Sequence, residues 1–175
     1  KLQAIDPRLQ GQEAKKCIFR LNRDIRFSAD KSPYKTQAAA VFSHLGKNGG
    51  MAGIYFHLGA GGNWVGGGSY MPEPADLKAI REEIAAEPTT WQALIGAKDF
   101  TRHFAGIEGE ALKRAPKGFE ELADTLPILK NKQFYFGADL TEADALAPTF
   151  ADRLVSYYQA ARPVNDFLLR ATGKG

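Results

Sequence analysis

The chain has 175 residues, of which 44% are apolar, and its 23 basic and 20 acidic residues leave a net charge of +3. These values are typical of one globular domain, exclude a disordered chain and give little electrostatic support to nucleic-acid binding. The single cysteine, Cys17, excludes an internal disulfide, and no apolar run reaches the roughly 20 residues of a membrane helix. We therefore expect a cytoplasmic protein without a membrane anchor.

The N-terminal residues 1–5 are typical of the end of a helix that stops before Pro7, because proline disfavours the helical conformation in the residue that precedes it. The chain begins with Lys1 rather than methionine. We therefore expect one domain, residues 1–175, that lacks a helical segment at its N-terminus.

Short runs of alternating hydrophobicity dominate the chain up to residue 71. They cover residues 17–21, 38–45, 51–58 and 63–71, and glycine-rich links separate the last three. Alternation over a few residues is typical of a strand with one buried face, and short links join antiparallel neighbours. The pattern predicts an antiparallel meander of three or four strands.

The period changes to that of helices after residue 71. Pro74 and Pro88 each suit the first turn of a helix, and the apolar residues of the first helix share one face: Leu77, Ile80 and Ile84. A further strand is expected at residues 133–138 and the longest helical stretch at residues 141–169. Together these elements predict an α+β fold in which helices pack on an antiparallel β-meander, with a long C-terminal helix that is kinked or ended at Pro163.

Most motifs of known chemistry are missing from the sequence. It contains neither a nucleophile elbow nor a phosphate-binding loop, and its glycine-rich residues 59–62 precede a strand rather than the helix that dinucleotide binding requires. The histidines at positions 44, 57 and 103 do not have the spacing of metal ligands, and one cysteine cannot complete a zinc site. We therefore predict no cofactor and no metal site.

Basic residues are concentrated between residues 20 and 35, where Asp24 and Asp30 stand among them. The planar guanidinium group is suited to bidentate contacts with a carboxylate or phosphate. One interpretation is therefore an anion-binding site; the other is a solvated loop whose arginines pair with the two aspartates and fix the path of the chain. The candidate ligand-binding residues of this segment are Arg20, Arg23, Arg26, Lys31, Tyr34 and Lys35.

Three consecutive glycines at residues 66–68 interrupt an expected strand, where glycine marks a bulge or the close approach of another group. The aromatic or imidazole side chains expected on one face of the sheet are Tyr55, His57, Trp64 and Tyr70. With a floor of glycines that includes Gly67, they would form a shelf for a planar ligand. The alternative is a helix packed flat on the glycines. His57 is the candidate catalytic residue, because an imidazole titrates near neutral pH, and its alternative role is structural.

A second basic segment at residues 112–119 contains the candidate ligand-binding residues Lys113, Arg114 and Lys117 beside a proline and a glycine. It is either part of a binding site or an ordinary exposed loop. We predict that residues 113–117 of this segment and residues 20–35 lie on one side of the sheet, close enough to share one anion.

Six blocks of the sequence carry a resemblance to a known family. They are Arg20-x-x-Arg23-Asp24-x-Arg26-Phe27-Ser28-x-Asp30-Lys31-x-Pro33-Tyr34-Lys35, Tyr55-Phe56-His57-Leu58, Val65-Gly66-Gly67-Gly68, Met71-Pro72-Glu73-Pro74, Leu112-Lys113-Arg114-x-Pro116-Lys117-Gly118-Phe119 and Lys130-x-Lys132-x-Phe134. In this order they resemble the bacterial and fungal family called domain of unknown function 2461. The resemblance implies a family without an established reaction.

Two departures from that family's pattern concern the candidate site. Members of the family usually begin with a further helical, aromatic-rich stretch, which this sequence lacks. An acidic residue and a proline often follow their His-Leu pair, where this chain has Gly59 and Ala60. No role of that acidic group is therefore transferred to this chain.

The residues favour one function among three. The first is a binding or catalytic domain for a small anionic molecule, held by the arginine cluster beside the glycine and aromatic face of the sheet. The second is a structural or protein-interaction module whose charges only organise its loops. Nucleic-acid binding is a weaker third, because the net charge of +3 is a poor electrostatic footprint. The sequence does not decide between an enzyme and a binding protein, and it does not indicate an oligomeric state.

Overall fold

The centre of the molecule is a four-stranded sheet. The computed structural model describes residues 1–27, 29–47, 49 and 53–175. The strands are β1 (Gln37–Phe42), β2 (Ile54–Gly59), β3 (Asn63–Ser69) and β4 (Phe134–Leu140), in the spatial order β1-β2-β3-β4. Every neighbouring pair is antiparallel, so the predicted meander is confirmed. The strand expected from residue 51 begins at Ile54, and residue 51 itself lies outside the described part of the chain.

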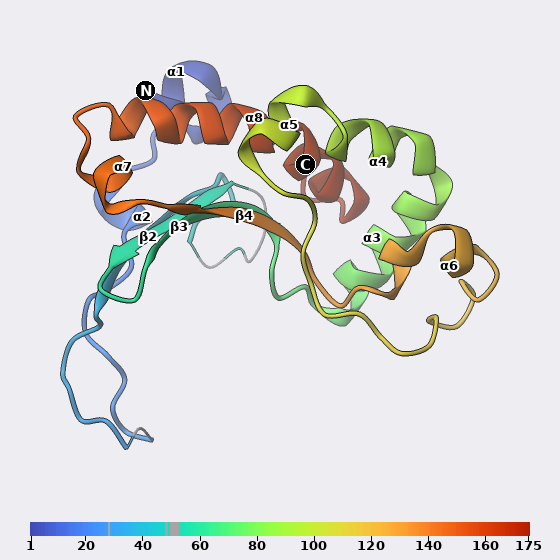
Figure 1. Ribbon diagram of the computed structural model, residues 1–175, viewed down its shortest axis with the longest axis horizontal. Coiled ribbons are helices and arrows are strands. Elements are labelled where there is room, and N and C mark those ends of the chain that lie inside the picture. The colour runs from blue at the N-terminus through green and yellow to red at the C-terminus, as the bar shows by residue number, and fades with distance from the viewer. Residues whose placement is uncertain (28, 48, 50–52) are drawn as a thin grey trace.

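Helices make up most of the remaining regular structure (Figure 1). They are α1 (Leu2–Ile5), α2 (Ala14–Cys17), α3 (Pro74–Ala86), α4 (Pro88–Ile95), α5 (Lys98–His103), α6 (Leu122–Thr125), α7 (Glu142–Leu146) and α8 (Phe150–Ala171). Two short 3-10 helices are η1 (Pro7–Leu9) and η2 (Pro127–Lys130). Pro74 and Pro88 occupy first-turn positions, as their sequence context predicts.

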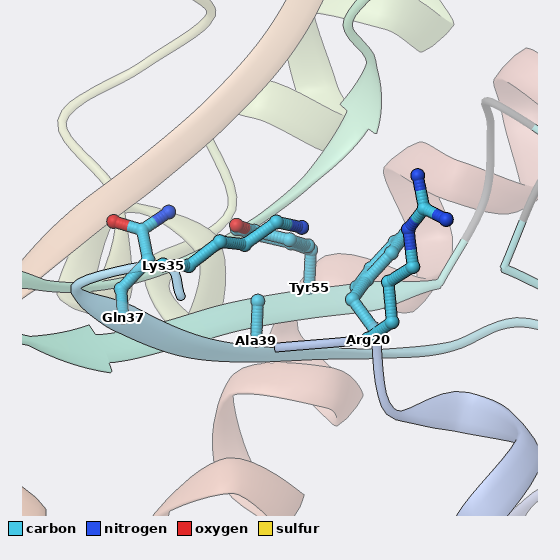
Figure 2. Close-up of a pocket in the computed structure, with 6 residues that line it drawn as sticks. Arg20, Lys35, Gln37, Ala39 and Tyr55 are labelled. Carbon is cyan, nitrogen blue, oxygen red and sulfur yellow. The ribbon is translucent and has the colours of Figure 1, made fainter. Parts of the chain in front are cut away.

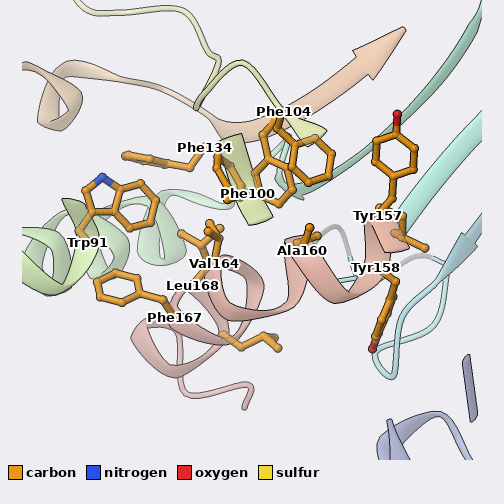
Figure 3. Close-up of a cluster of buried hydrophobic side chains, with 14 of the residues drawn as sticks. Trp91, Phe100, Phe104, Phe134, Tyr157, Tyr158, Ala160, Val164, Phe167 and Leu168 are labelled. Atoms are coloured by element: carbon orange, nitrogen blue, oxygen red, sulfur yellow. The ribbon is translucent and has the colours of Figure 1, made fainter. Parts of the chain in front are cut away.

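One face of the sheet is covered by α8, which packs on β3 and β2. Side chains that alternate toward this face, such as Val65 and Phe136, are fully buried, and Phe167 and Leu168 meet them from the helix. Figure 3 shows the aromatic part of this core, where Trp91 from α4 and the two phenylalanines of α5 and its C-terminal cap gather beside α8. The apolar alternation of the strands and the apolar stripe of the helices therefore meet in one core.

The long C-terminal helix runs through Pro163 as a single element, so the proline does not end it. Figure 1 shows that α8 changes direction along its length, as expected where a proline removes a backbone hydrogen bond. The helical stretch expected from residue 141 is divided in two. Thr141 caps the separate helix α7 through a capping box with Asp144, and Pro148 stands in the link to α8.

The run at residues 17–21 does not form the strand that its weak alternation suggested. It makes one isolated bridge, between Ile18 and Ala40 on β1. The chain then leaves the sheet as a projecting hairpin of residues 20–35, here called the basic hairpin (Figure 1). Two backbone hydrogen bonds tie its arms together, from the Arg23 amide to the Pro33 carbonyl and from the Lys35 amide to the Leu21 carbonyl.

A buried carboxylate fastens the N-terminal residues to α8. Asp6 is 1% exposed and accepts hydrogen bonds from the Tyr158 hydroxyl at 2.6 Å and from Arg8 Nε at 3.0 Å. Arg8 continues the network to Asp166 on α8, at 2.9 Å. The guanidinium of Arg8 holds the pKa of Asp6 well below its ordinary value, because its hydrogen bonds favour the charged carboxylate more than burial disfavours it.

Candidate functional site

The face of the sheet opposite α8, here called the open face, carries a broad concavity of about 720 Å³. Tyr55 and His57 of β2 and Trp64 of β3 point to this face, because residues two apart share one side of a strand and His57 pairs directly with Trp64. All three line the concavity, together with backbone from the glycine run of β3. The structure thus brings together the aromatic residues and the glycines that the sequence placed on one face.

The aromatic rings of the open face contact one another. The His57 ring stacks on Trp64, with centroids 6.3 Å apart and planes 13° apart. Tyr55 lies 5.8 Å from His57 and 6.0 Å from Trp64, measured between ring centroids. The three side chains therefore form one continuous surface, in which each ring limits the rotation of the next.

The sequence reasoning missed Gly137 of β4, a glycine that lies beneath the Trp64 ring. Gly66 pairs with Gly137 of β4, and the Trp64 indole fills the space above both. A Cβ atom on Gly66 would stand 2.2 Å from Trp64 Cη2, and one on Gly137 would stand 1.9 Å from Trp64 Cζ2. The pairing across two strands could not be seen in the sequence, although Gly137 interrupts an otherwise aromatic strand.

The alternative interpretation of the glycine run, helix packing, is realised in part by one side chain of α8. Asn165 is buried, accepts a hydrogen bond from the Gly68 amide at 2.9 Å and donates one to the Gly53 carbonyl at 2.8 Å. A Cβ atom on Gly67 would meet the Gly53 carbonyl oxygen at 2.7 Å. The glycines therefore serve both faces of the sheet, since the helix approaches on one side and the indole lies on the other.

Two basic side chains lie at the β1 edge of the concavity. Arg20 and Lys35 line a smaller cavity of about 220 Å³, which shares Phe19, Gln37 and Tyr55 with the larger one. Figure 2 shows the two side chains on either side of Tyr55, with Lys35 extended toward that ring. The Lys35 ammonium lies 6.0 Å from the centroid of the Phe19 ring. One end of the aromatic surface is therefore positively charged.

The other cations of the basic hairpin are engaged within the hairpin. Arg26 forms a bidentate ion pair with Asp24, at 2.9 and 2.7 Å, and Arg23 pairs with Asp30. The hydrogen bonds from Arg26 lower the pKa of the exposed Asp24 carboxyl.

The side chains of Lys31 and Tyr34 also stay within the hairpin or in solvent. Lys31 Nζ donates to the Ile25 carbonyl at 3.0 Å, and Tyr34 is 63% exposed. Arg23, Arg26, Lys31 and Tyr34 do not line either cavity, so the structure does not bring the three arginines together on one anion. The ion pairs instead fix the path of the hairpin.

The second basic segment is remote from the first. Lys113, Arg114 and Lys117 are exposed and line neither cavity. In Figure 1 the basic hairpin projects at one end of the long axis, while residues 112–119 lie near α6 at the other end. The expectation that the two segments share one anion is therefore wrong, because they sit at opposite ends of the molecule.

His57 is half-buried in the wall of the concavity. Its Nδ1 atom is buried, and within the described part of the chain it has no hydrogen-bond partner. Burial lowers the pKa of the imidazole, and the negative charge of Asp139 opposes this effect. The ring is therefore neutral at neutral pH, the form that can accept a proton or a hydrogen bond.

The β4 edge of the concavity has a different chemistry, of which the sequence reasoning identified Tyr70 but neither Tyr135 nor Glu108. Tyr70 and Tyr135 meet edge to face there, with ring centroids 5.2 Å apart. The backbone of Glu108 pairs with Tyr135, its amide 2.6 Å from the Tyr135 carbonyl oxygen, and its side chain lines the concavity. Burial, followed by the charge of Glu108, raises the pKa of the Tyr135 hydroxyl. Glu108 lies far from β4 in sequence, in a segment without regular periodicity, so no local pattern places it here.

Two further observations bear on the class of protein. Among the described residues there is no group of three or more histidine, cysteine, aspartate or glutamate side chains that could hold a metal ion. The same part of the chain contains no helix with the length and apolar character needed to cross a membrane.

Comparison with known proteins supports the resemblance seen in the sequence. The family model described as a conserved hypothetical protein, DUF2461, matches residues 1–167. Neither the curated proteins nor the solved structures contain a match to this chain. Because the family match covers nearly the whole chain, including both arms of the basic hairpin, the sheet and most of α8, the protein belongs to the DUF2461 family of conserved hypothetical proteins.

Proposed function

We propose that this domain binds a small molecule with an anionic group and a planar part on the open face of its sheet. One observation carries the proposal: two cations, Arg20 and Lys35, line a cavity of about 220 Å³ that adjoins the aromatic-lined concavity of about 720 Å³ and shares Tyr55 with it. A ligand pocket typically combines an apolar surface with a few fixed polar groups, and this face has both. The single buried cysteine suits a cytoplasmic setting for such a site.

The anionic group of the ligand is assigned to Arg20 and Lys35. Arg26 in the same hairpin has its carboxylate partner, whereas within the described residues Arg20 makes no hydrogen bond or ion pair and feels Asp24 only through space. A carboxylate or phosphate would give the Arg20 guanidinium charge-assisted hydrogen bonds, each worth about 1.5–3 kcal/mol. Arg20 rather than Arg23 or Arg26 is therefore the proposed anchor.

The planar part of the ligand is assigned to Tyr55, His57 and Trp64. Stacking on an aromatic ring contributes about 0.5–1.5 kcal/mol beyond the area that it buries. The Trp64 ring is held in place by its neighbours and by the glycines below it, so little rotamer freedom remains to be lost on binding. This pre-organisation favours a flat ligand over a flexible one.

His57 supplies the proposed site with a candidate general base. A neutral imidazole in the wall of the concavity accepts a hydrogen bond from the ligand, and it would move a proton if an acidic or leaving group lay beside its ring. The general base must lie within hydrogen-bonding reach of that proton, so the position of the ligand decides between binding and catalysis.

The experiment is a calorimetric titration with inorganic phosphate, benzoate, a mononucleotide and a short single-stranded oligonucleotide at constant ionic strength. Wild type is compared with Arg20→Ala and with Arg26→Ala, a matched control whose arginine is removed from an ion pair outside the cavities. We expect at least one small anion to bind wild type and Arg26→Ala equally, and Arg20→Ala about tenfold or more weakly. No binding to wild type, or equal binding to all three proteins, contradicts the proposal.

A protein-interaction module is the second candidate, favoured by the basic hairpin. Phe27 on this hairpin is 95% exposed, and two further large apolar side chains of the hairpin are at least half exposed, Leu21 and Tyr34. Several exposed apolar side chains on one segment favour an interaction surface. If no anion or oligonucleotide binds the wild type, and the protein purifies from its host with one stoichiometric partner that Phe27→Ser loses, the interaction function replaces the ligand site. Binding of the oligonucleotide alone would instead favour nucleic acid.

A further inference from the structure

The charged residues that line the two connected cavities are segregated by sign. Arg20 and Lys35 lie at the β1 edge, and Lys47 joins them there, its ammonium 3.4 Å from the carbonyl oxygen of Ile18, which is bridged to β1. Glu108 lies at the other edge, where its backbone pairs with Tyr135 of β4. The aromatic rings occupy the space between. The concavity therefore has a positive end and a negative end.

The negative end is built from aromatic rings as well as a carboxylate. Tyr70 and Tyr135 stand at 73° to each other and form a corner, and Glu108 lies beside the Tyr135 ring. Tyr70 is 60% exposed, so its ring is accessible from solvent. A corner of two electron-rich rings beside a carboxylate is the arrangement that attracts an organic cation.

No cation of the described chain neutralises this end. Glu108 forms no ion pair among the described residues, whereas its neighbour Glu110 pairs with Lys132 at 2.9 Å. Burial and then the charge of Glu108 raise the pKa of the neighbouring Tyr135 hydroxyl, a group that supplies no positive charge. The carboxylate is therefore available to a ligand, and the same charge repels a second anionic group.

We propose that Tyr70, Tyr135 and Glu108 form a subsite for an organic ammonium group, so that the ligand of the open face is dipolar. This inference rests on the proposed function, because the anionic group of the same ligand is assigned to Arg20 and Lys35. The ligand class is a molecule with a planar centre, a carboxylate or phosphate at one end and an amine or quaternary ammonium at the other. A molecule that is anionic along its whole length does not fit.

The sheet sets the separation of the two charges. Lys35 extends toward Tyr55 on β2 in Figure 2, and Tyr135 is on β4, two strands away. Neighbouring strands are about 4.8 Å apart, so the two subsites are about 10 Å apart across the strands. Trp64 of β3 lies between them, under the expected planar centre.

The test is a chemical-shift titration of the isotope-labelled protein with benzyltrimethylammonium, with benzyl alcohol as the uncharged comparison. We expect the ammonium probe to shift the amide signals around Tyr135 and Tyr70, and benzyl alcohol to leave them nearly unchanged. In Glu108→Gln the affinity for the ammonium probe should fall about fivefold or more, as when a carboxylate beside a cation–π site is neutralised. Glu110→Gln, the matched control, should bind like wild type.

A second pair of variants distinguishes the contribution of the Tyr135 ring to ammonium binding from that of its hydroxyl. Tyr135→Phe keeps the ring and should retain most of the affinity for the ammonium probe, whereas Tyr135→Leu should lose it. Thermal melts of each variant establish that it is folded, and Glu108 is exposed, so its substitution leaves the core intact.

Two outcomes overturn the inference: no shift around Tyr135 with the ammonium probe, or equal affinity in wild type and Glu108→Gln. Titration with benzoate is read separately, because it depends on Arg20 rather than Glu108. Benzoate binding without ammonium binding leaves the proposed function standing and removes this inference. Ammonium binding without binding of benzoate, phosphate or the mononucleotide contradicts the proposed function and the dipolar ligand, and leaves only a cation site.

Discussion

The indole of Trp64 occupies the position that a side chain on Gly137 would fill. A Cβ atom on Gly137 would stand 1.9 Å from Cζ2 and 2.2 Å from Cε2 of that ring. Because Gly137 pairs directly with Gly66, the ring lies across a gap in two neighbouring strands. The orientation of the aromatic surface on the open face therefore depends on the absence of two side chains.

Gly137→Ala should move the Trp64 ring. The added methyl group overlaps a rigid indole, so the ring must rotate away, and overpacking of this kind costs about 1–3 kcal/mol. We expect a lower free energy of unfolding and altered tryptophan fluorescence, since Trp91 is fully buried elsewhere and should not change. Gly61→Ala is the control, because a Cβ atom there has no neighbour within 4 Å. Equal behaviour of the two variants would show that the indole does not depend on Gly137.

Gly67→Val should lower the free energy of unfolding by more than about 2 kcal/mol, through steric conflict. A Cβ atom there would lie 2.7 Å from the Gly53 carbonyl oxygen and 3.1 Å from Cζ of Phe136. The carbonyl is held by Asn165, so it cannot move away without losing a buried hydrogen bond. Urea denaturation measures the change, and an unfolding midpoint unaltered within error would mean that the strand has room for a side chain.

Asp6→Asn should destabilise the protein by about 3 kcal/mol at neutral pH, because it leaves a partly buried arginine without its main partner. Asp152→Asn, which removes an exposed ion pair with Lys1, should cost about 0.5 kcal/mol or less. Chemical denaturation of both variants and wild type measures these differences.

The same pair of variants makes a pH prediction. The pKa of Asp6 is lowered in the folded protein, so its stabilisation is complete above the ordinary value of 3.8 and is lost as the pH falls below it. The difference between wild type and Asp6→Asn should therefore shrink on acidification. A difference independent of pH would show that the charge of Asp6 is not what stabilises the N-terminal residues.

His57 should titrate with a pKa below its ordinary value of 6.5, because burial disfavours the imidazolium. The unfolded state then binds the proton more readily, so this group's stabilisation is complete above pH 6.5 and decreases as the pH falls through it. NMR titration of the ring measures the pKa directly, and His57→Gln should flatten this part of the stability profile. A pKa at or above 6.5 would remove the neutral imidazole from the proposed site.

The sequence by itself determined the four strands of the sheet, the three longest helices and part of the composition of the open face. Alternation has a period of two, so the positions of Tyr55, His57 and Trp64 followed from local spacing alone, as did the helix starts at Pro74 and Pro88. The family followed from blocks of residues in a fixed order and is confirmed over residues 1–167. The strands, the helix starts and the positions of the side chains on one face depend on residues close together in the chain.

Only the tertiary structure decided which charges reach the open face. The sequence grouped Arg20 with Arg23 and Arg26, but the fold of the basic hairpin pairs Arg23 and Arg26 with its own aspartates and leaves Arg20 at the cavity. Ion pairing depends on the distance between side chains, which the turn of the hairpin sets.

The contacts across the sheet could not be predicted from the sequence either. Gly137 meets Trp64, and Glu108 meets Tyr135, only because strand pairing and the path of a long loop bring distant segments together. Strand register is fixed by burial of one face of the sheet against α8 and the aromatic residues of α4 and α5, so it is a property of the assembled core and not of any single segment.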